Sequence, residues 1–254
     1  MNTVIEELSG RVFGKRRRIT LMRHGSVSYF DASSRPVGAD LVPLNELGRA
    51  QSVAAGDLLK HTAFDRVIVS GLPRTIETVE LVLKRNRNRN RNRPPDYEAW
   101  HEFREIRGTR MRDIKPEDLQ AGFLEVFGRP SNFDARFMGG ESVREFTDRV
   151  WPAFARLLAD PAWKEALLVL HGGTNRAILS YCLAHGRAGK CAAFLPGLHQ
   201  APACINLIDV GVADEADFVV RAVNIAALDL LQTRTRKTTL EGLLEKLLKF
   251  KRSH

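Results

Sequence analysis

Hydrophobic positions along the chain follow two patterns. Short apolar runs rich in β-branched residues are typical of buried strands, and apolar residues recurring every three or four positions are typical of amphipathic helices. We predict strands near residues 19–23, 64–70, 166–171, 203–210 and 217–223, with an extended segment at 96–106. We predict helices near 45–60, 73–84, 116–127, 142–159, 172–183 and 238–250, the first with an apolar stripe of Leu47, Ala50, Ala54 and Leu58.

Two predicted strands end in the same dipeptide. Residues 19–26 read Ile-Thr-Leu-Met-Arg-His-Gly-Ser, and residues 166–173 read Ala-Leu-Leu-Val-Leu-His-Gly-Gly. Glycine lets the chain turn sharply where a strand stops. Open α/β sheets bind ligands at the carboxyl ends of their strands. We therefore take His24 and His171 as candidate site residues.

Two arginines accompany these histidines. Arg23 directly precedes His24, and Arg74 lies in the first turn of the helix predicted to begin at Pro73, just after a strand. A helix N-terminus attracts anions, and guanidinium groups bind phosphate oxygens in a bidentate manner. The four residues suggest a pocket for a dianion, in which one histidine attacks phosphorus and the other stabilises the transition state.

A metal centre is a weaker interpretation of the same histidines. Their neighbours are glycines, and Cys182, Cys191 and Cys204 lack the paired spacing of zinc ligands. We expect no metal. The lack of a disulfide framework and of a signal-like N-terminus favours a cytoplasmic protein.

Several motifs occur together in the order of a known family. They are Leu21-Met22-Arg23-His24-Gly25, Pro43 to Gly48 with Gln51, Ser70 to Thr75 with Thr78, Gly139-Gly140-Glu141-Ser142, and His171-Gly172-Gly173. With these motifs the chain resembles the histidine phosphatase superfamily, the phosphoglycerate mutase-like group, over roughly residues 18–223. The resemblance implies a three-layer α/β/α sandwich with a mixed, mostly parallel sheet. It also implies no metal and no organic cofactor.

The resemblance assigns roles to residues at the matching positions. His24 becomes the nucleophile that forms phosphohistidine, and its Nδ1–H is expected to be held by a main-chain carbonyl near Gly25. Arg23, Arg74 and Gly172 bind the phosphoryl group, and His171 completes the pocket. A carboxyl group from the 102–105 region protonates the leaving oxygen. We prefer Glu105, which precedes the Gly108 turn, and keep Glu102 as the alternative.

These roles predict a histidine acid phosphatase-type phosphomonoesterase, metal-independent and acting through phosphohistidine. One alternative is a phosphoglycerate mutase-type phosphotransferase. The stretch Ser26-Val27-Ser28-Tyr29 lacks the Glu-Ser and tryptophans that mutases of the family carry after Arg-His-Gly, so we favour hydrolysis. Another alternative is an RNA- or anion-binding protein on an inactive phosphatase fold.

Much of the net charge of +9 lies in one low-complexity tract. Residues 85–93 alternate Arg and Asn and contribute five arginines. We expect a solvated loop with no buried residue, remote from the site because it joins a helix to a strand. An RNA clamp is the alternative, but without interleaved aromatic residues nucleic acid is an unlikely partner. The substrate is expected to be a phosphorylated small molecule, with a phosphoprotein as a further option.

The domain organisation follows from these assignments. Residues 1–17 form a lead-in, 18–232 the phosphatase domain including the Arg-Asn loop, and 233–254 an amphipathic tail. No apolar stretch is long enough to span a bilayer. The tail helix is expected to pack on its own domain or in a homodimer, with binding to a membrane surface as the alternative.

Overall fold

One mixed sheet of six strands organises the described part of the chain. The computed structural model describes residues 16–31, 37–88, 96–109, 126, 132–186, 197–211, 217–230, 236–237 and 239–253. The strands are β1 (Arg17–Arg23), β2 (Arg66–Val69), β3 (Glu98–Ala99), β4 (Glu165–Leu170), β5 (Ile205–Val210) and β6 (Phe218–Ile225). Their order in the sheet is β3-β2-β4-β1-β5-β6. Strands β3, β2, β4 and β1 run parallel to one another, whereas β5 is antiparallel to both β1 and β6.

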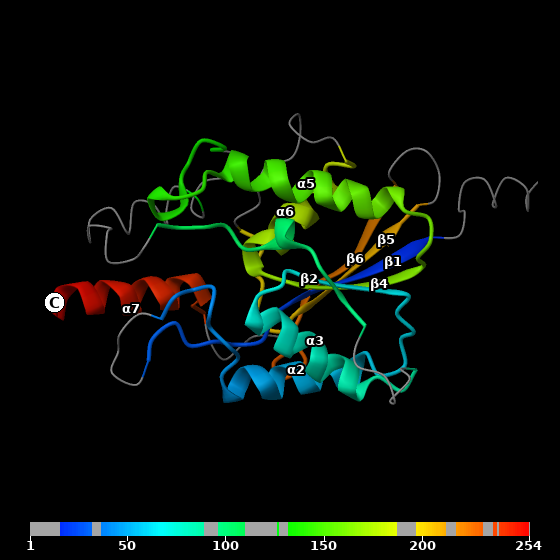
Figure 1. Ribbon diagram of the computed structural model, residues 1–254, viewed down its shortest axis with the longest axis horizontal. Coiled ribbons are helices and arrows are strands. Elements are labelled where there is room, and N and C mark those ends of the chain that lie inside the picture. The colour runs from blue at the N-terminus through cyan, green and yellow to red at the C-terminus, as the bar shows by residue number, and fades with distance from the viewer. Residues whose placement is uncertain are drawn as a thin grey trace, which may run out of the picture.

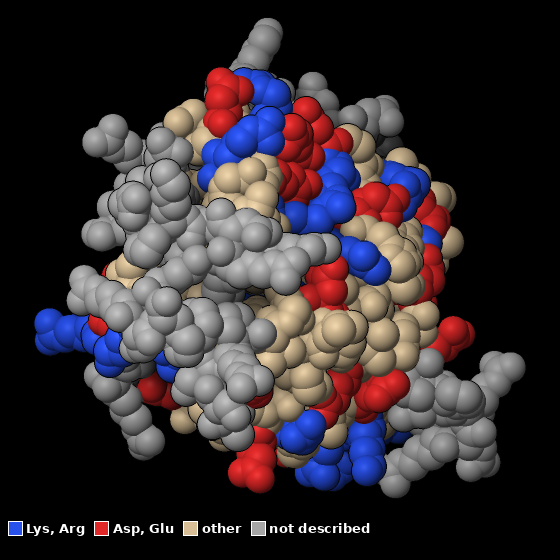
Figure 2. All heavy atoms as spheres, turned by 60° about the vertical axis from the view of Figure 1, so that its left-hand side comes forward, with Lys and Arg blue, Asp and Glu red and all other residues tan. Residues whose placement is uncertain are grey.

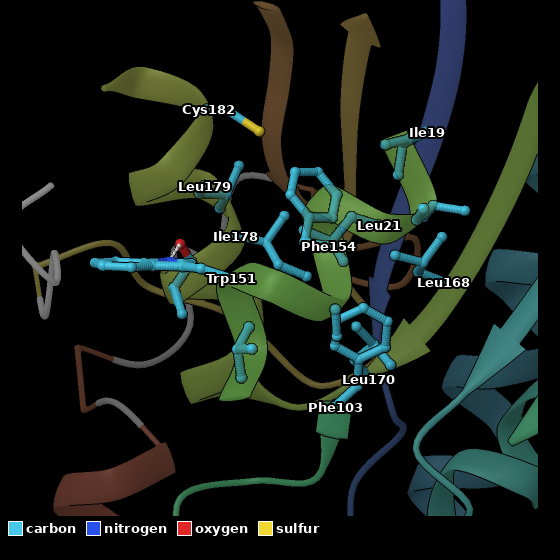
Figure 3. Close-up of a cluster of buried hydrophobic side chains, with 14 of the residues drawn as sticks. Ile19, Leu21, Phe103, Trp151, Phe154, Leu168, Leu170, Ile178, Leu179 and Cys182 are labelled. Carbon is cyan, nitrogen blue, oxygen red and sulfur yellow. Dashed lines mark hydrogen bonds between the residues drawn. The ribbon is translucent and has the colours of Figure 1, made fainter. Parts of the chain in front are cut away.

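Helices cover both faces of this sheet. Helices α2 (Glu46–Leu58) and α3 (Pro73–Arg85) lie on one face, and α5 (Val143–Ala159) and α6 (Gly172–Leu183) on the other (Figure 1). A hydrophobic cluster fills each interface, and Figure 3 shows the larger one, between the sheet and α5 and α6. The predicted three-layer α/β/α sandwich is confirmed.

The central strands β1 and β4 position the site. Leu168 and Leu170 enter one hydrophobic cluster, while Leu167 and Val169 enter the other, so β4 is buried on both faces. Burial on both faces explains why these parallel strands read as continuous apolar runs. Because Arg23 pairs in register with Leu170, the residues that follow the two strands emerge side by side.

Helix α2 begins where predicted but buries a different face. Asn45 caps it by accepting a hydrogen bond from the Gly48 amide at 2.8 Å. The expected stripe is wrong: Leu47, Ala50 and Leu58 are exposed and Ala54 is only half-buried. The buried face consists of small residues, Gly48, Ser52, Ala55 and Gly56. Backbone approaches too closely here for larger side chains, since a Cβ on Gly48 would lie 2.1 Å from the Ser26 carbonyl oxygen.

The segment predicted to be extended at 96–106 contains a turn. After the short strand β3 the chain forms a 3₁₀ turn, η1 (His101–Phe103), which directs the fully buried Phe103 into the larger core near Leu170 (Figure 3). A second 3₁₀ turn, η3 (Phe137–Gly139), precedes α5. The helix predicted at 116–127 lies outside the described residues except for Val126.

The Arg-Asn tract begins as packed structure. Helix α3 ends at Arg85, whose guanidinium pairs with Asp57 at 2.7 Å. Asn86 is 4% exposed and its side-chain amide donates to the Leu59 and Thr62 carbonyls at 3.3 and 2.8 Å. The expectation that no residue of the tract is buried is therefore wrong for Asn86, because its amide satisfies carbonyls after α2. Residues 89–93 lie outside the described part.

The predicted C-terminal helix is confirmed as α7 (Thr239–Ser253). It lies beyond the end of the sheet at which β1 passes into the following loop (Figure 1). Its Leu247 is fully buried, so at least one residue of its apolar side is covered. Among the described helices, none combines the length and apolarity needed to cross a membrane.

Candidate active site

His24 and His171 lie together at the ends of β1 and β4. Their ring centroids are 5.2 Å apart and the planes are inclined by 66°. Both side chains are buried, with 3% and 0% of their surfaces exposed. The structure thus brings together the two histidines that the strand ends singled out.

One ring nitrogen of His24 is held by the backbone. Nδ1 lies 2.7 Å from the carbonyl oxygen of Gly25, which can only accept, so Nδ1 carries the proton and Nε2 keeps its lone pair. Burial lowers the pKa of His24 well below the usual 6.5, and the nearby Arg74 and Arg23 lower it further. A neutral imidazole with a free Nε2 pair is the nucleophilic form.

A chain of hydroxyl groups sets the tautomer of His171. Thr75 Oγ1 donates to the Leu72 carbonyl at 2.8 Å, so Ser70 Oγ donates to Thr75 Oγ1 at 3.1 Å. Ser70 Oγ must then accept from Nε2 of His171, 2.7 Å away. Nδ1 of His171 is therefore unprotonated, and within the described residues it has no hydrogen-bond partner. Burial, followed by Arg74, His24 and Arg23, lowers the pKa of His171 well below 6.5.

Arg74 and Arg23 supply the positive charge. Arg74 is 2% exposed in the first turn of α3, and its Nη1 donates to the Ala39 carbonyl at 2.5 Å. Its Nε is buried without a hydrogen-bond partner in the described ranges. The Arg23 guanidinium donates to the Gln200 carbonyl. Both cations lie close enough to lower the pKa of each histidine, which places them around the same pocket.

The turn after β1 requires glycine. A Cβ on Gly25 would lie 2.4 Å from the Gly48 carbonyl oxygen and 2.8 Å from Ser52 Oγ. The Gly25 amide donates to Thr78 Oγ1 at 3.1 Å, and the Ser26 amide donates to Gln51 Oε1 at 2.9 Å. The Pro43–Gln51 and Ser70–Thr78 motifs therefore hold the turn that carries His24.

Of the two candidate carboxylates, only Glu105 reaches the pocket. Its Oε2 accepts from the Gly173 amide at 2.8 Å and its Oε1 from the Ile106 amide at 3.0 Å. This position places the carboxyl group at the N-terminus of α6, whose first residue follows His171. A Cβ on Gly173 would lie 2.2 Å from Oε1, so the close approach requires glycine. Glu102 instead pairs with Arg156 at 2.9 Å on the surface.

Sequence reasoning missed a third arginine of the pocket, which is buried like Arg74. Arg176 is 5% exposed and donates from Nε to the Leu198 carbonyl at 2.7 Å. A Cβ on Gly172 would lie 3.5 Å from Arg23 Nε and 3.6 Å from Arg176 Nη1, so both guanidinium groups border the start of α6. Burial and Arg23 lower the pKa of Arg176 to about 10, which leaves it charged at neutral pH. The i, i+4 spacing from Gly172 was the signal in the sequence.

Thiol and metal chemistry find little support in the described residues. Cys182 and Cys204 are buried and unbridged, and burial raises the pKa of Cys204 to about 12, so its thiol stays protonated. No three His, Cys, Asp or Glu side chains within the described ranges gather as a metal site. The pocket instead has the composition of an oxyanion site, with guanidinium groups, imidazoles and one carboxylate.

Comparison with known proteins decides the family. The profile of the Histidine phosphatase superfamily (branch 1) matches residues 19–225, most of the chain. The chain belongs to this superfamily. The matched range contains every residue of the pocket described above, so the sequence-based family prediction is confirmed.

Three proteins illustrate what this chain is similar to. An acid phosphatase of Mycobacterium tuberculosis is 28% identical over 169 residues, covering 65% of this chain and 75% of that protein. The "Probable phosphoglycerate mutase GpmB" of Salmonella paratyphi A is 28% identical over 159 residues, covering 61% and 69%. A mycobacterial glucosyl-3-phosphoglycerate phosphatase shares the fold, with a TM-score of 0.64 at 23% identity over 82% of this chain and 99% of its own. The predicted phosphomonoesterase activity is confirmed at the level of the family.

Proposed function

We propose that His24 is the nucleophile of a metal-independent phosphomonoester hydrolase. The observation that carries this proposal is the hydrogen bond from Nδ1 to Gly25, which leaves the Nε2 lone pair of a buried, neutral imidazole free to attack. In the first step the Nε2–P bond forms while the P–O bond to the leaving group breaks. Arg23 and Arg74 bind the phosphoryl oxygens, and Gly172, which borders Arg23 at the start of α6, belongs to the same binding site.

His171 enters the reaction through the state of its Nδ1. The Ser70 hydroxyl holds the ring proton on Nε2, so His171 can donate to a phosphoryl oxygen only after Nδ1 also takes up a proton and the imidazole becomes an imidazolium. A bound phosphate dianion raises the pKa of the imidazole by its charge and favours that protonation. A monoanionic ester can supply the proton itself. His171 then donates to an oxygen on which charge develops in the transition state.

Glu105 is proposed to donate a proton to the leaving oxygen and later to accept one from the attacking water. In the first step its carboxylic acid gives a proton to the leaving oxygen, and in the second the resulting carboxylate takes a proton from the water that attacks phosphohistidine. The N–P bond breaks as the water oxygen bonds to phosphorus, which releases phosphate and restores both residues. This role is supported by the hydrogen bond that Glu105 accepts from the amide of Gly173, two residues after His171.

Net hydrolysis is proposed over phosphoryl return to the substrate. Mutase chemistry needs a first loop that keeps the phosphoenzyme dry, whereas residues 26–40 are rich in Ser, Ala and Gly. The deciding assay uses the purified protein with chelator and supplies 3-phosphoglycerate, sugar phosphates, nucleotides and phosphopeptides. We expect phosphate release without a bisphosphoglycerate primer. Interconversion of the two monophosphoglycerates faster than phosphate release would establish the mutase instead.

A phosphorylated small molecule is the proposed substrate, and nucleic acid is not a proposed partner. On the face shown in Figure 2, Lys and Arg side chains are interspersed with Asp and Glu side chains over the described residues. Among the described residues, arginines also form ion pairs, such as Arg66 with Glu98 and Arg144 with Asp134. A face on which charges of both signs alternate attracts polyanions less than a uniformly basic face, which supports a small-molecule substrate.

Other features rest on the sequence and stay proposals. They are the phosphatase domain bounds of 18–232, a cytoplasmic location, a phosphoprotein substrate and a homodimer through the C-terminal helix. Size-exclusion chromatography with light scattering tests the dimer, and the phosphopeptide arm of the assay tests the substrate.

A further inference from the structure

Arg149 on α5 uses every donor of its guanidinium group. Nε and Nη2 form a bidentate pair with Glu141 at 2.7 and 2.9 Å. Nη1 donates to the Glu102 and Arg104 carbonyls at 2.6 and 2.8 Å, and Nη2 also donates to the Glu105 carbonyl at 2.9 Å. One side chain thus fixes three backbone carbonyls around the turn that carries Glu105.

Glu141 continues this contact on the other side of Glu105. Its Oε2 accepts from the Arg107 amide at 3.0 Å, and its own amide donates to the Arg107 carbonyl at 2.7 Å. A Cβ on Gly140 would lie 2.4 Å from that carbonyl oxygen, so glycine is needed for the approach. The motif Gly139-Gly140-Glu141-Ser142 therefore binds the backbone of Arg107, just after Glu105.

The Arg149–Glu141 pair is well shielded from water. The side chains are 16% and 10% exposed. Phe103 anchors the same turn from within the core (Figure 3), and Thr174 Oγ1 on α6 lies 3.3 Å from its carbonyl oxygen. The backbone of residues 102–107 is thus held from α5, α6 and the segment before α5. Within the described residues, no hydrogen bond joins Arg149 or Glu141 to the ring of His24 or to the carboxyl group of Glu105, although the charge of Arg149 is among the causes that lower the pKa of His171.

We propose that the Arg149–Glu141 pair positions Glu105 for proton transfer to the leaving oxygen, an inference that rests on the proposed function. A general acid acts only within hydrogen-bond reach of its proton acceptor. The Glu105 carboxylate is held by the Gly173 and Ile106 amides, and its backbone is held by Arg149. Arg149 and Glu141 are positioning residues, because they act through Glu105 and not on the substrate.

Arg149→Lys provides the main test. Lysine keeps the charge and much of the length but cannot reach five acceptors in the geometry of a guanidinium group. We expect kcat/KM for an alkyl phosphate to fall about 10²-fold, the order of loss that a misplacement of about 1 Å produces. Turnover of p-nitrophenyl phosphate should change little, because its leaving group needs little protonation. A loss of fold alone would lower both activities together.

Arg156→Lys is the matched control. Arg156 lies on the same helix and pairs with the Glu102 carboxylate from the surface at 2.9 Å. Its substitution should leave the ratio of the two activities unchanged. If Arg149→Lys fails to fold, Glu141→Gln is the second variant. It removes the negative charge of the pair with little change in volume, and it should lower kcat/KM for the alkyl phosphate relative to that for p-nitrophenyl phosphate.

Two outcomes separate this inference from the proposed function. The positioning role would be overturned if Arg149→Lys left the ratio of kcat/KM for the two substrates unchanged while the His24 phosphoenzyme still formed. That outcome would leave the assignment of the nucleophile intact. Absence of a phosphoenzyme in the unaltered protein is a failure of the proposed function itself.

Discussion

The imidazole rings of His24 and His171 meet edge to face, with centroids 5.2 Å apart, at the ends of neighbouring parallel strands. Burial and the charges of Arg74 and Arg23 lower the pKa of both rings, so two neutral bases face each other in a cationic pocket. Their tautomers are opposite, since His24 is protonated at Nδ1 and His171 at Nε2. This asymmetry suits His24 to attack phosphorus through Nε2. It suits His171 to take up a proton on Nδ1 and then to donate a hydrogen bond to a phosphoryl oxygen.

His24→Ala should abolish turnover, because the variant has no Nε2 to form the bond to phosphorus. Denaturing the wild-type enzyme with detergent at alkaline pH, shortly after it is mixed with a labelled substrate, should trap a base-stable, acid-labile phosphoenzyme that the variant lacks. His61→Ala removes an exposed histidine and should behave as wild type. Labelling that persists in His24→Ala would assign the nucleophile elsewhere.

Arg74→Lys should fold yet lose about 10²–10³ in kcat/KM, the usual effect of removing one transition-state donor. A point ammonium cannot replace the bidentate contact of a guanidinium with phosphoryl oxygens. Steady-state kinetics together with a thermal unfolding curve measures both properties. Arg49→Lys, at an exposed arginine of α2 that pairs with Glu77, is the control. Near-normal kcat/KM for Arg74→Lys would place this side chain outside the phosphoryl site.

Glu105→Gln should slow alkyl phosphates far more than p-nitrophenyl phosphate, because only the former need a proton on the leaving oxygen. Glu102→Gln should show no such selectivity, since that carboxylate pairs with Arg156 at the surface. Measuring kcat/KM against the leaving-group pKa for both variants makes the comparison. If only Glu102→Gln steepens the dependence, the assignment of the acid is reversed.

Stability should fall as the pH drops below 6.5. The unfolded chain takes up protons on its histidines near this pH, whereas the folded protein binds them on His24 and His171 only at lower pH. The unfolded state then binds more protons, and the free energy of unfolding decreases by up to about 1.4 kcal/mol per pH unit for each histidine. Urea unfolding between pH 7.5 and 5.5 should show that the free energy of unfolding depends less steeply on pH in His171→Gln than in the wild type. An equal dependence on pH in the wild type and His171→Gln would contradict the lowered pKa.

Local sequence patterns pointed to four residues that the structure brings together in the candidate pocket. An apolar strand followed by His-Gly, and a strand followed by Pro-Arg at a helix start, are local patterns whose direction is set by backbone geometry. Parallel strands then bring His24, Arg74 and His171 to one edge of the sheet. The sequence marked the strand ends, and the parallel pairing of β2, β4 and β1, which the family resemblance implied, brings those ends together.

Contacts between distant elements decided the rest. Helix α2 buries Gly48 and Gly56 and exposes Leu47, because close approach to the Ser26 turn and to α3 outweighs the burial of larger side chains. Whether Glu102 or Glu105 faces the pocket depends on the 3₁₀ turn that Phe103 and Arg149 fix, and Arg176 joins the site because α6 starts beside Arg23. Helical and strand periodicity report which residues share a face of one element. They do not report which other element packs against that face, so only the tertiary structure determined these positions.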